Sequence, residues 1–199
     1  IFSLINERKS ISRAEIAKTV KLTPTTVSSL VDELLSLGLV RETGEGQSLP
    51  TGRKPILLTV EASGIQIPVL SFKPSGILFV LFNLCFEKIE SLFLPFSSIM
   101  GSKNGGDTER IEYSVVDGSE FANLAIDILT KRSEKINLNK VKALCIAMPG
   151  TFEWDENKFS SSVLQVKGSI DFIGEISRRL QNLPMLVGNE SAFLAYAEN

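Results

Sequence analysis

The sequence predicts a small α+β domain over residues 1–60 and an α/β domain over residues 61–199. Residues 1–60 combine helical apolar spacing with two short extended segments, whereas residues 61–199 alternate strand-like apolar runs with helical patterns. The first sixty residues carry eight Lys or Arg against six Asp or Glu, and the remainder carries thirteen against seventeen. A slightly basic first domain on an acidic second one favours a nucleic-acid partner for the first.

Local signals place three helices in the first domain. Apolar residues at helical spacing start the first helix at Ile1. The second starts at a capping box, in which the side chains of Ser12 and Glu15 bind each other's backbone amides. Thr23 followed by Pro24 starts the third helix, because threonine caps helices well and proline fits the first helical position.

The third helix is expected to end at Gly38 and to bury one apolar stripe. The stripe consists of Val27, Leu30, Val31, Leu34 and Leu35. Two extended segments, 39–41 and 56–60, then flank a loop over 42–55 that is rich in Gly, Ser, Thr and Pro. Three helices followed by such a hairpin form the winged helix-turn-helix arrangement.

The second domain begins with three strand-like runs, over 65–70, 76–84 and 89–96. The run 76–84 is nearly all apolar, so we expect a strand covered on both faces. After a polar loop over 100–107, the predicted elements are a helix from Ser119, a strand over 141–148, a helix over 170–180, a strand over 184–187 and a helix over 190–197. This order predicts an α/β domain whose last strands are joined by crossovers.

Composition narrows the function. The chain has no histidine, which excludes Ser-His and Cys-His catalysis and His-ligated metals. Its two cysteines, Cys85 and Cys145, provide neither a disulfide framework nor a cysteine-rich zinc site. We therefore expect no metal and no cofactor. We also expect no membrane partner and a cytoplasmic location, because targeting segments and runs of about 18 apolar residues are absent.

Candidate DNA-binding residues cluster in the first domain. The polar face near the start of the third helix presents small donors and acceptors that can bind phosphates and base edges: Thr25, Thr26, Ser28 and Ser29. Arg13 and Lys21, near the two ends of the second helix, can clamp phosphates. Arg53 and Lys54 make the hairpin tip basic, which suits the minor groove or its phosphates. The alternative for each group is an ordinary solvated surface.

The first sixty residues closely resemble the DNA-binding head of ROK-family transcriptional regulators. The resemblance rests on stretches such as 11–17, 26–28, 31–35 and 52–55. The rest resembles the N-terminal lobe of the family's sugar-kinase-like body, an actin-like and ribonuclease H-like α/β fold. Its anchors are 147–150, an apolar strand that ends in Pro-Gly, and 183–192, which is similar to the family's Pro-Val…Glu-Asn-Asp-Ala segment.

The resemblance implies a homodimer or higher homo-oligomer that binds a double-stranded DNA operator and a sugar or sugar-phosphate effector. Pro149, Gly150, Asn189 and Glu190 are the implied effector-binding residues. In the family's kinases the asparagine binds sugar and the following aspartate is the catalytic base, so Glu190 would be catalytic only if this chain were a kinase. Asn189 and Glu190 can instead cap the last helix.

Departures from the family pattern argue against catalysis. The family's Asp-x-Gly-x-Thr phosphate turn corresponds here to 70–75, which has no acidic residue and lacks the small residues that let backbone amides approach phosphate. Glu190 is one methylene longer than the family's aspartate, which misplaces a base that must reach within ~3 Å. We therefore expect a non-enzymatic regulator, a repressor of carbohydrate-related genes.

Two other functions stay open: an active sugar kinase with a DNA-binding head, and a DNA-binding module whose body only dimerises. Residues 61–199 are expected to form less than half of a two-lobed body.

Overall fold

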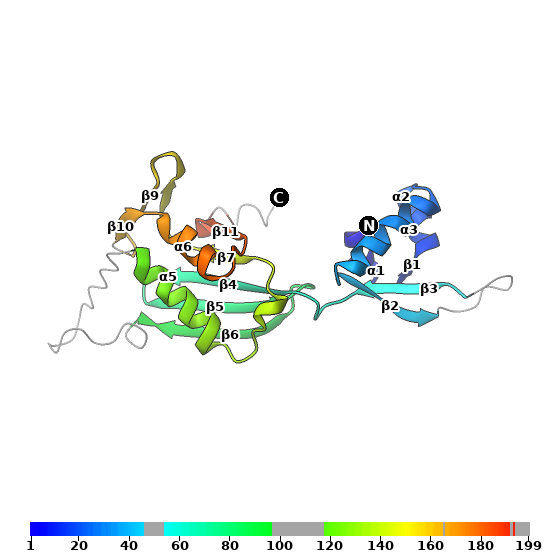
Figure 1. Ribbon diagram of the computed structural model, residues 1–199, viewed down its shortest axis with the longest axis horizontal. Helices are drawn as coiled ribbons and strands as arrows, with labels where there is room; N and C mark the ends of the chain where they lie inside the picture. The colour runs from blue at the N-terminus through cyan, green and yellow to red at the C-terminus, as the bar shows by residue number, and fades with distance from the viewer. Residues whose placement is uncertain (46–53, 97–117, 165, 192, 194–199) are drawn as a thin grey trace. The chain divides into compact units, whose positions relative to one another are not determined.

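The computed structural model describes residues 1–45, 54–96, 118–164, 166–191 and 193 (Figure 1). The chain packs as two compact units. We call the first one, Ile1–Gln66 with Asn83–Glu87, the head, and the second, Ile67–Phe82 with Lys88–Asn199, the body. Each unit has its own apolar core.

The head is a winged helix-turn-helix, as predicted. Its helices are α1 (Phe2–Arg8), α2 (Arg13–Val20) and α3 (Pro24–Ser36). Its strands are β1 (Ile11–Ser12), β2 (Val40–Glu45) and β3 (Ile56–Val60), in the antiparallel order β1-β3-β2. Strand β1 was not expected, because two residues are too few to show an alternating pattern; its Ile11 pairs with Leu58 and its Ser12 with Leu57.

The helix ends follow the predicted chemistry. The capping box at Ser12 and Glu15 is present, and the Thr23 hydroxyl accepts from the Thr26 amide at 3.2 Å. Gly38 has a left-handed φ of 66°, and the amide of the next residue, Leu39 N–H, donates to the Leu34 carbonyl at 3.0 Å. This bond and the one from the Gly38 amide to Leu35 form a Schellman ending, which satisfies carbonyls that the helix leaves unpaired.

The predicted stripe of α3 is narrower than expected. Val27 and Val31 are fully buried in the head core, and Leu34 and Leu35 pack at its margin. Leu30 was predicted to be buried, and this is wrong: the side chain is 39% exposed. In so small a domain only the residues that face α1, α2 and the sheet can be covered, and Leu30 lies outside that arc.

The body is built on a five-stranded sheet in the order β11-β7-β4-β5-β6. Its strands are β4 (Gln66–Lys73), β5 (Gly76–Asn83), β6 (Lys88–Pro95), β7 (Leu144–Ala147) and β11 (Met185–Gly188). Strands β4, β7 and β11 run parallel, and β6 is antiparallel to β5. This is the α/β class expected, with crossovers before β7 and β11.

Helices α5 (Gly118–Asp127) and α6 (Asp171–Arg179) lie on one face of this sheet (Figure 1). Short helical turns follow α5 and precede β7: a π-helix at Ile128–Arg132 and a 3-10 helix at Leu138–Lys140. A second, three-stranded sheet contains β8 (Thr151–Glu153), β9 (Lys158–Ser161) and β10 (Val166–Ser169), and a 3-10 turn at Trp154–Glu156 joins β8 to β9.

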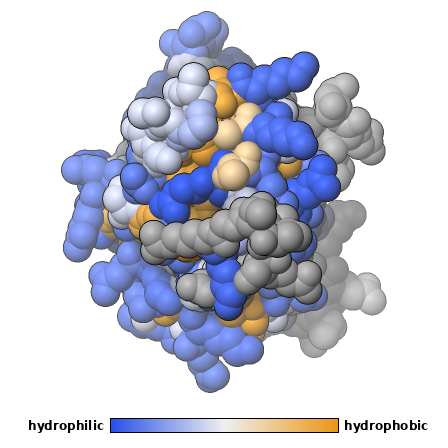
Figure 2. All heavy atoms as spheres, turned by 90° about the vertical axis from the view of Figure 1, so that its right-hand side faces the viewer, coloured by the Kyte–Doolittle hydropathy of each residue, from blue (hydrophilic) through white to orange (hydrophobic). Residues whose placement is uncertain are grey.

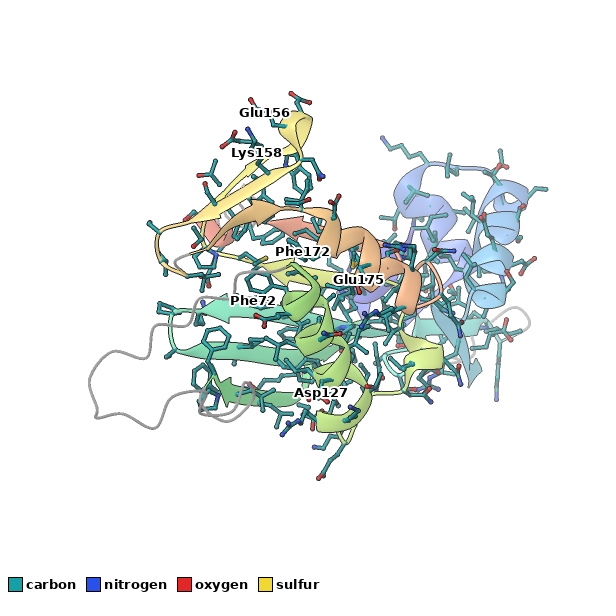
Figure 3. All side chains as sticks on the ribbon, turned by 60° about the vertical axis from the view of Figure 1, so that its left-hand side comes forward. Phe72, Asp127, Glu156, Lys158, Phe172 and Glu175 are labelled. Carbon is teal, nitrogen blue, oxygen red and sulfur yellow. The ribbon has the colours of Figure 1, made fainter. Side chains whose placement is uncertain are left out.

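Aromatic side chains tie the helices to the sheet. Phe72 of β4 and Phe172 of α6 lie between the sheet and the helices (Figure 3), and Phe121 of α5 contacts both, with ring centroids 5.2 and 5.5 Å away. Each of these rings is almost fully buried. This aromatic layer therefore joins both helices to β4.

Strand β5 differs from the prediction that both of its faces are covered. Ile77, Phe79 and Leu81 are fully buried, but Leu78 and Val80 between them are only half-buried. In the described part of the chain, the core helices pack on one face of the sheet, so burial alternates along the strand.

Some predicted segments lie outside the described residues: the loop 100–107 and the hairpin tip over 46–53. Of the final helix, Glu190 and Ser191 are helical, and its later part is only partly described. Among the described residues, no helix is long and apolar enough to cross a bilayer.

Candidate nucleic-acid interface and effector site

The polar side chains that are predicted to contact DNA lie at the start of α3. With Thr23 as cap and Pro24 as the first helical residue, Thr25, Thr26 and Ser29 are exposed, while Ser28 is half-buried. The hydroxyls of Thr23 and Thr26 bond to each other at 2.8 Å, which fixes the Thr26 side chain on the helix. The arrangement leaves short polar side chains able to enter a groove closely.

Figure 2 views the head from the side that is on the right in Figure 1. This surface is mostly hydrophilic, with apolar atoms showing between the polar side chains. Among the exposed apolar residues of the head are Leu22, 43% exposed, and Leu30, 39% exposed. Scattered side chains of this kind are usual on a protein surface and indicate no site by themselves.

Three of the basic residues that are predicted to contact DNA lie outside α2, and the structure describes two of them. Lys21 is exposed at the end of α2 in a left-handed conformation, with its amide bound to the Ala17 carbonyl. Lys54 is exposed just before β3. Arg53 lies outside the described residues, so its predicted role rests on the sequence.

Arg13 is engaged within the head. Its Nη2 lies 2.9 Å from Oδ1 of Asp32 in α3, and its Nη1 lies 2.9 Å from Oε1 of Glu42 in β2. The side chain is 27% exposed. The hydrogen bond to Glu42, more than any other contact, raises the pKa of Arg13, and the bond to Asp32 adds to it. One guanidinium therefore holds together three elements of the head.

The predicted effector residues converge at one edge of the body sheet. Pro149 and Gly150 follow β7, and Asn189 and Glu190 follow β11, so all four lie beyond the carboxyl ends of neighbouring parallel strands. Ligands of open α/β sheets bind at this edge. The Asn189 side-chain amide donates to the Gly150 carbonyl, which joins the two segments.

Asn189 also caps the last helix, as the alternative interpretation proposed. Its Oδ1 accepts from the Ser191 amide at 2.8 Å. Gly150 has a packing role as well, because a Cβ there would lie 2.4 Å from the Ser160 carbonyl oxygen. Both residues thus have structural duties that do not require a ligand.

Glu190 is paired with a lysine that was not predicted to belong to this site. The Nζ of Lys73, at the end of β4, binds Oε1 of Glu190. Lys73 belongs to the segment that corresponds to the family's phosphate turn. The carboxylate that the resemblance aligns with the family's base is therefore bound to an ammonium group from that segment.

The missed partners are distant in the sequence. Asp32 and Glu42 lie 19 and 29 positions from Arg13, and Glu190 lies 117 positions from Lys73. In the sequence, the only signal for the partners of Arg13 was the presence of acidic residues in the predicted third helix and after it. Such residues do not show which basic side chain they bind.

Residues 1–41 match the family of winged helix-turn-helix DNA-binding domains. The chain is 30% identical over 196 residues to the xylose repressor of Caldicellulosiruptor bescii, covering 96% of this chain and 44% of that protein. It is 39% identical over 61 residues to the xylose repressor of Staphylococcus xylosus, covering 30% of this chain and 16% of that protein. The chain thus spans less than half the length of these relatives.

The fold also has a solved counterpart. The crystal structure of a ROK family transcriptional regulator, a homologue of the E. coli MLC protein, matches with a TM-score of 0.65 and 16% identity, covering 95% of this chain and 44% of that one. The match extends over head and body together. The chain therefore shares the fold of this ROK family regulator, with a winged-helix head followed by an α/β body in the same order.

Proposed function

We propose that this chain acts as a sequence-specific DNA-binding transcriptional repressor of carbohydrate-related genes. The observation that carries the proposal is the exposed polar start of α3, within a head whose first 41 residues match winged helix-turn-helix DNA-binding domains. In such domains this helix enters the major groove. Thr25, Thr26 and Ser29 are the proposed base and phosphate contacts, with Ser28 beside them.

Two heads are proposed to bind together. An operator with two-fold symmetry presents its half-sites about one helical turn apart, and a homodimer matches that symmetry. Lys21, Arg53 and Lys54 would then contact phosphates next to each recognition helix, and the wing would reach the minor groove.

The body is proposed to be non-catalytic and to receive a sugar or sugar phosphate near Pro149, Gly150 and Asn189. Support comes from the Lys73–Glu190 pair, because Lys73 Nζ binds Oε1 of the carboxylate that the resemblance aligns with the family's base. The relatives named as xylose repressors make a pentose a reasonable first ligand to test.

The experiment that tests DNA binding selects duplexes from a random pool with the full chain, then measures affinity against salt. Arg53→Ala with Lys54→Ala is expected to weaken binding and to reduce the slope of log K against log salt by about 1.8, because each phosphate contact contributes about 0.9. Lys142→Ala, which removes an exposed cation of the body, is the matched control and should leave the slope unchanged.

A chain that enriches no sequence would contradict the proposal as a whole. An unchanged slope in the double variant would remove only the wing from the interface.

A further inference from the structure

Arg13 is the first residue of α2, and its guanidinium group divides its bonds between two carboxylates. Each terminal nitrogen binds a different partner at 2.9 Å, Asp32 in α3 and Glu42 in β2. Only a planar fork with separate donors can hold two carboxylates in fixed directions, which a lysine ammonium does not do. The contact therefore fixes three elements in one relative arrangement.

Both partners lie where their position affects DNA recognition. Asp32 follows Ser29 by three positions and Thr25 by seven, so it lies on the same face of α3 as the proposed reading residues. Glu42 lies in β2, which forms the base of the wing together with β3, and a register shift between Glu42 and Gly44 lies beside it in the β2–β3 pairing. Such an irregularity bends a strand and changes the direction of the residues beyond it.

We propose that Arg13 is a positioning residue for DNA recognition: it binds a carboxylate of α3 and a carboxylate of β2, and so fixes the base of the wing against the recognition helix α3. The inference rests on the proposed DNA-binding function. It replaces the expected role of Arg13 as a phosphate clamp, because both of its terminal nitrogens already bind carboxylates.

The two roles predict opposite results for the acidic partners. If Arg13 contacted phosphate, removing Asp32 or Glu42 would free its guanidinium and remove a negative charge near DNA, so binding would tighten. If Arg13 positions the wing, removing either carboxylate releases one side of the contact, and specific binding weakens although the head becomes less negative.

The test compares Arg13→Lys, Asp32→Asn and Glu42→Gln in the full chain. Affinity is measured for a duplex selected by the unaltered protein and for a mixed-sequence duplex, over a range of salt. Each variant is expected to lose about two- to fivefold in affinity for the selected duplex, the range for exposed ion pairs. Affinity for the mixed-sequence duplex should be unchanged in Arg13→Lys and unchanged or raised in the other two.

Circular dichroism tests whether each variant folds. Asp32 and Glu42 lie at the surface, with side chains 67% and 42% exposed, so their variants still test the inference if Arg13→Lys loses structure. Tighter binding of the selected duplex by Asp32→Asn and Glu42→Gln would overturn the inference. So would an equal loss on both duplexes. If the unaltered protein selects no sequence, both the proposed function and this inference fail. If it selects one, the proposed function stands, and the results for the variants alone decide whether Arg13 is a positioning residue.

Discussion

Ser12 serves two elements at once, since it is the last residue of β1 and the cap of α2. Its hydroxyl accepts from the Glu15 amide at 3.3 Å, and its own amide and hydroxyl donate to Oε2 of Glu15 at 2.9 and 2.7 Å. The bond from the Ser12 amide, followed by the one from its hydroxyl, lowers the pKa of Glu15. The contact therefore favours the charged form of Glu15.

Replacing Ser12 with Ala is expected to lower the free energy of unfolding by about 1 kcal/mol at pH 7. Because the pKa of Glu15 is lower in the folded head than the ordinary 4.5, its contribution is complete above that value and disappears as pH falls through the folded pKa. Urea titrations should show the difference between the two proteins shrinking below about pH 4. A difference that stays constant down to about pH 2 would contradict this account.

At the scale of elements, the left-handed Gly38 ends α3 and starts the turn into the wing. Gly38→Ala is expected to destabilise the head by about 1–2 kcal/mol. A Cβ there would meet nothing within 4 Å, so the cost comes from the backbone conformation alone. Thermal circular dichroism should show a fall of about 4–8 °C per kcal/mol in the transition of the head.

Gly174→Ala is the matched control. Gly174 lies inside α6, where a Cβ also meets nothing within 4 Å and no left-handed conformation is needed. The same chemical change there should stabilise the body by about 0.5–1 kcal/mol. Similar destabilisation by both substitutions would rule out the conformation of Gly38 as the cause.

The sequence allowed prediction of the elements that local chemistry determines. The helix starts at Ser12 and Thr23 and the ending at Gly38 depend on residues within five positions, so they could be read directly. The short strand β1 and the exposure of Leu30 depend on what the rest of the head covers. The same reason hid the partners of Arg13 and Lys73, since long-range ion pairs leave no periodic pattern.

At the scale of the whole molecule, two cores predict two unfolding transitions. The head contains neither Trp nor Tyr, whereas the single tryptophan, Trp154, stacks on Phe152 in the body with ring centroids 5.1 Å apart. Trp154 emission should therefore follow the body alone, and far-ultraviolet circular dichroism should follow both units. We expect the two signals to have different midpoints.

The substitutions above give the control for this expectation. Gly38→Ala should move the circular-dichroism transition and leave the Trp154 midpoint unchanged. Coincident midpoints in every protein would show instead that head and body unfold as one cooperative unit.

The pairing of β1 with β3 has a consequence during synthesis of the chain. Ile11 pairs with Leu58, so an early residue of the head is held by β3, the last of the strands β1 to β3 to be synthesised. The helices are synthesised before this strand. The head cannot complete its core until the strand is made, because the chain between Ile11 and Leu58 must close before the contacts that stabilise the pairing can form. A nascent head that ends before Ile56 therefore lacks the strand that seals its core, and it is most open to proteases at that stage.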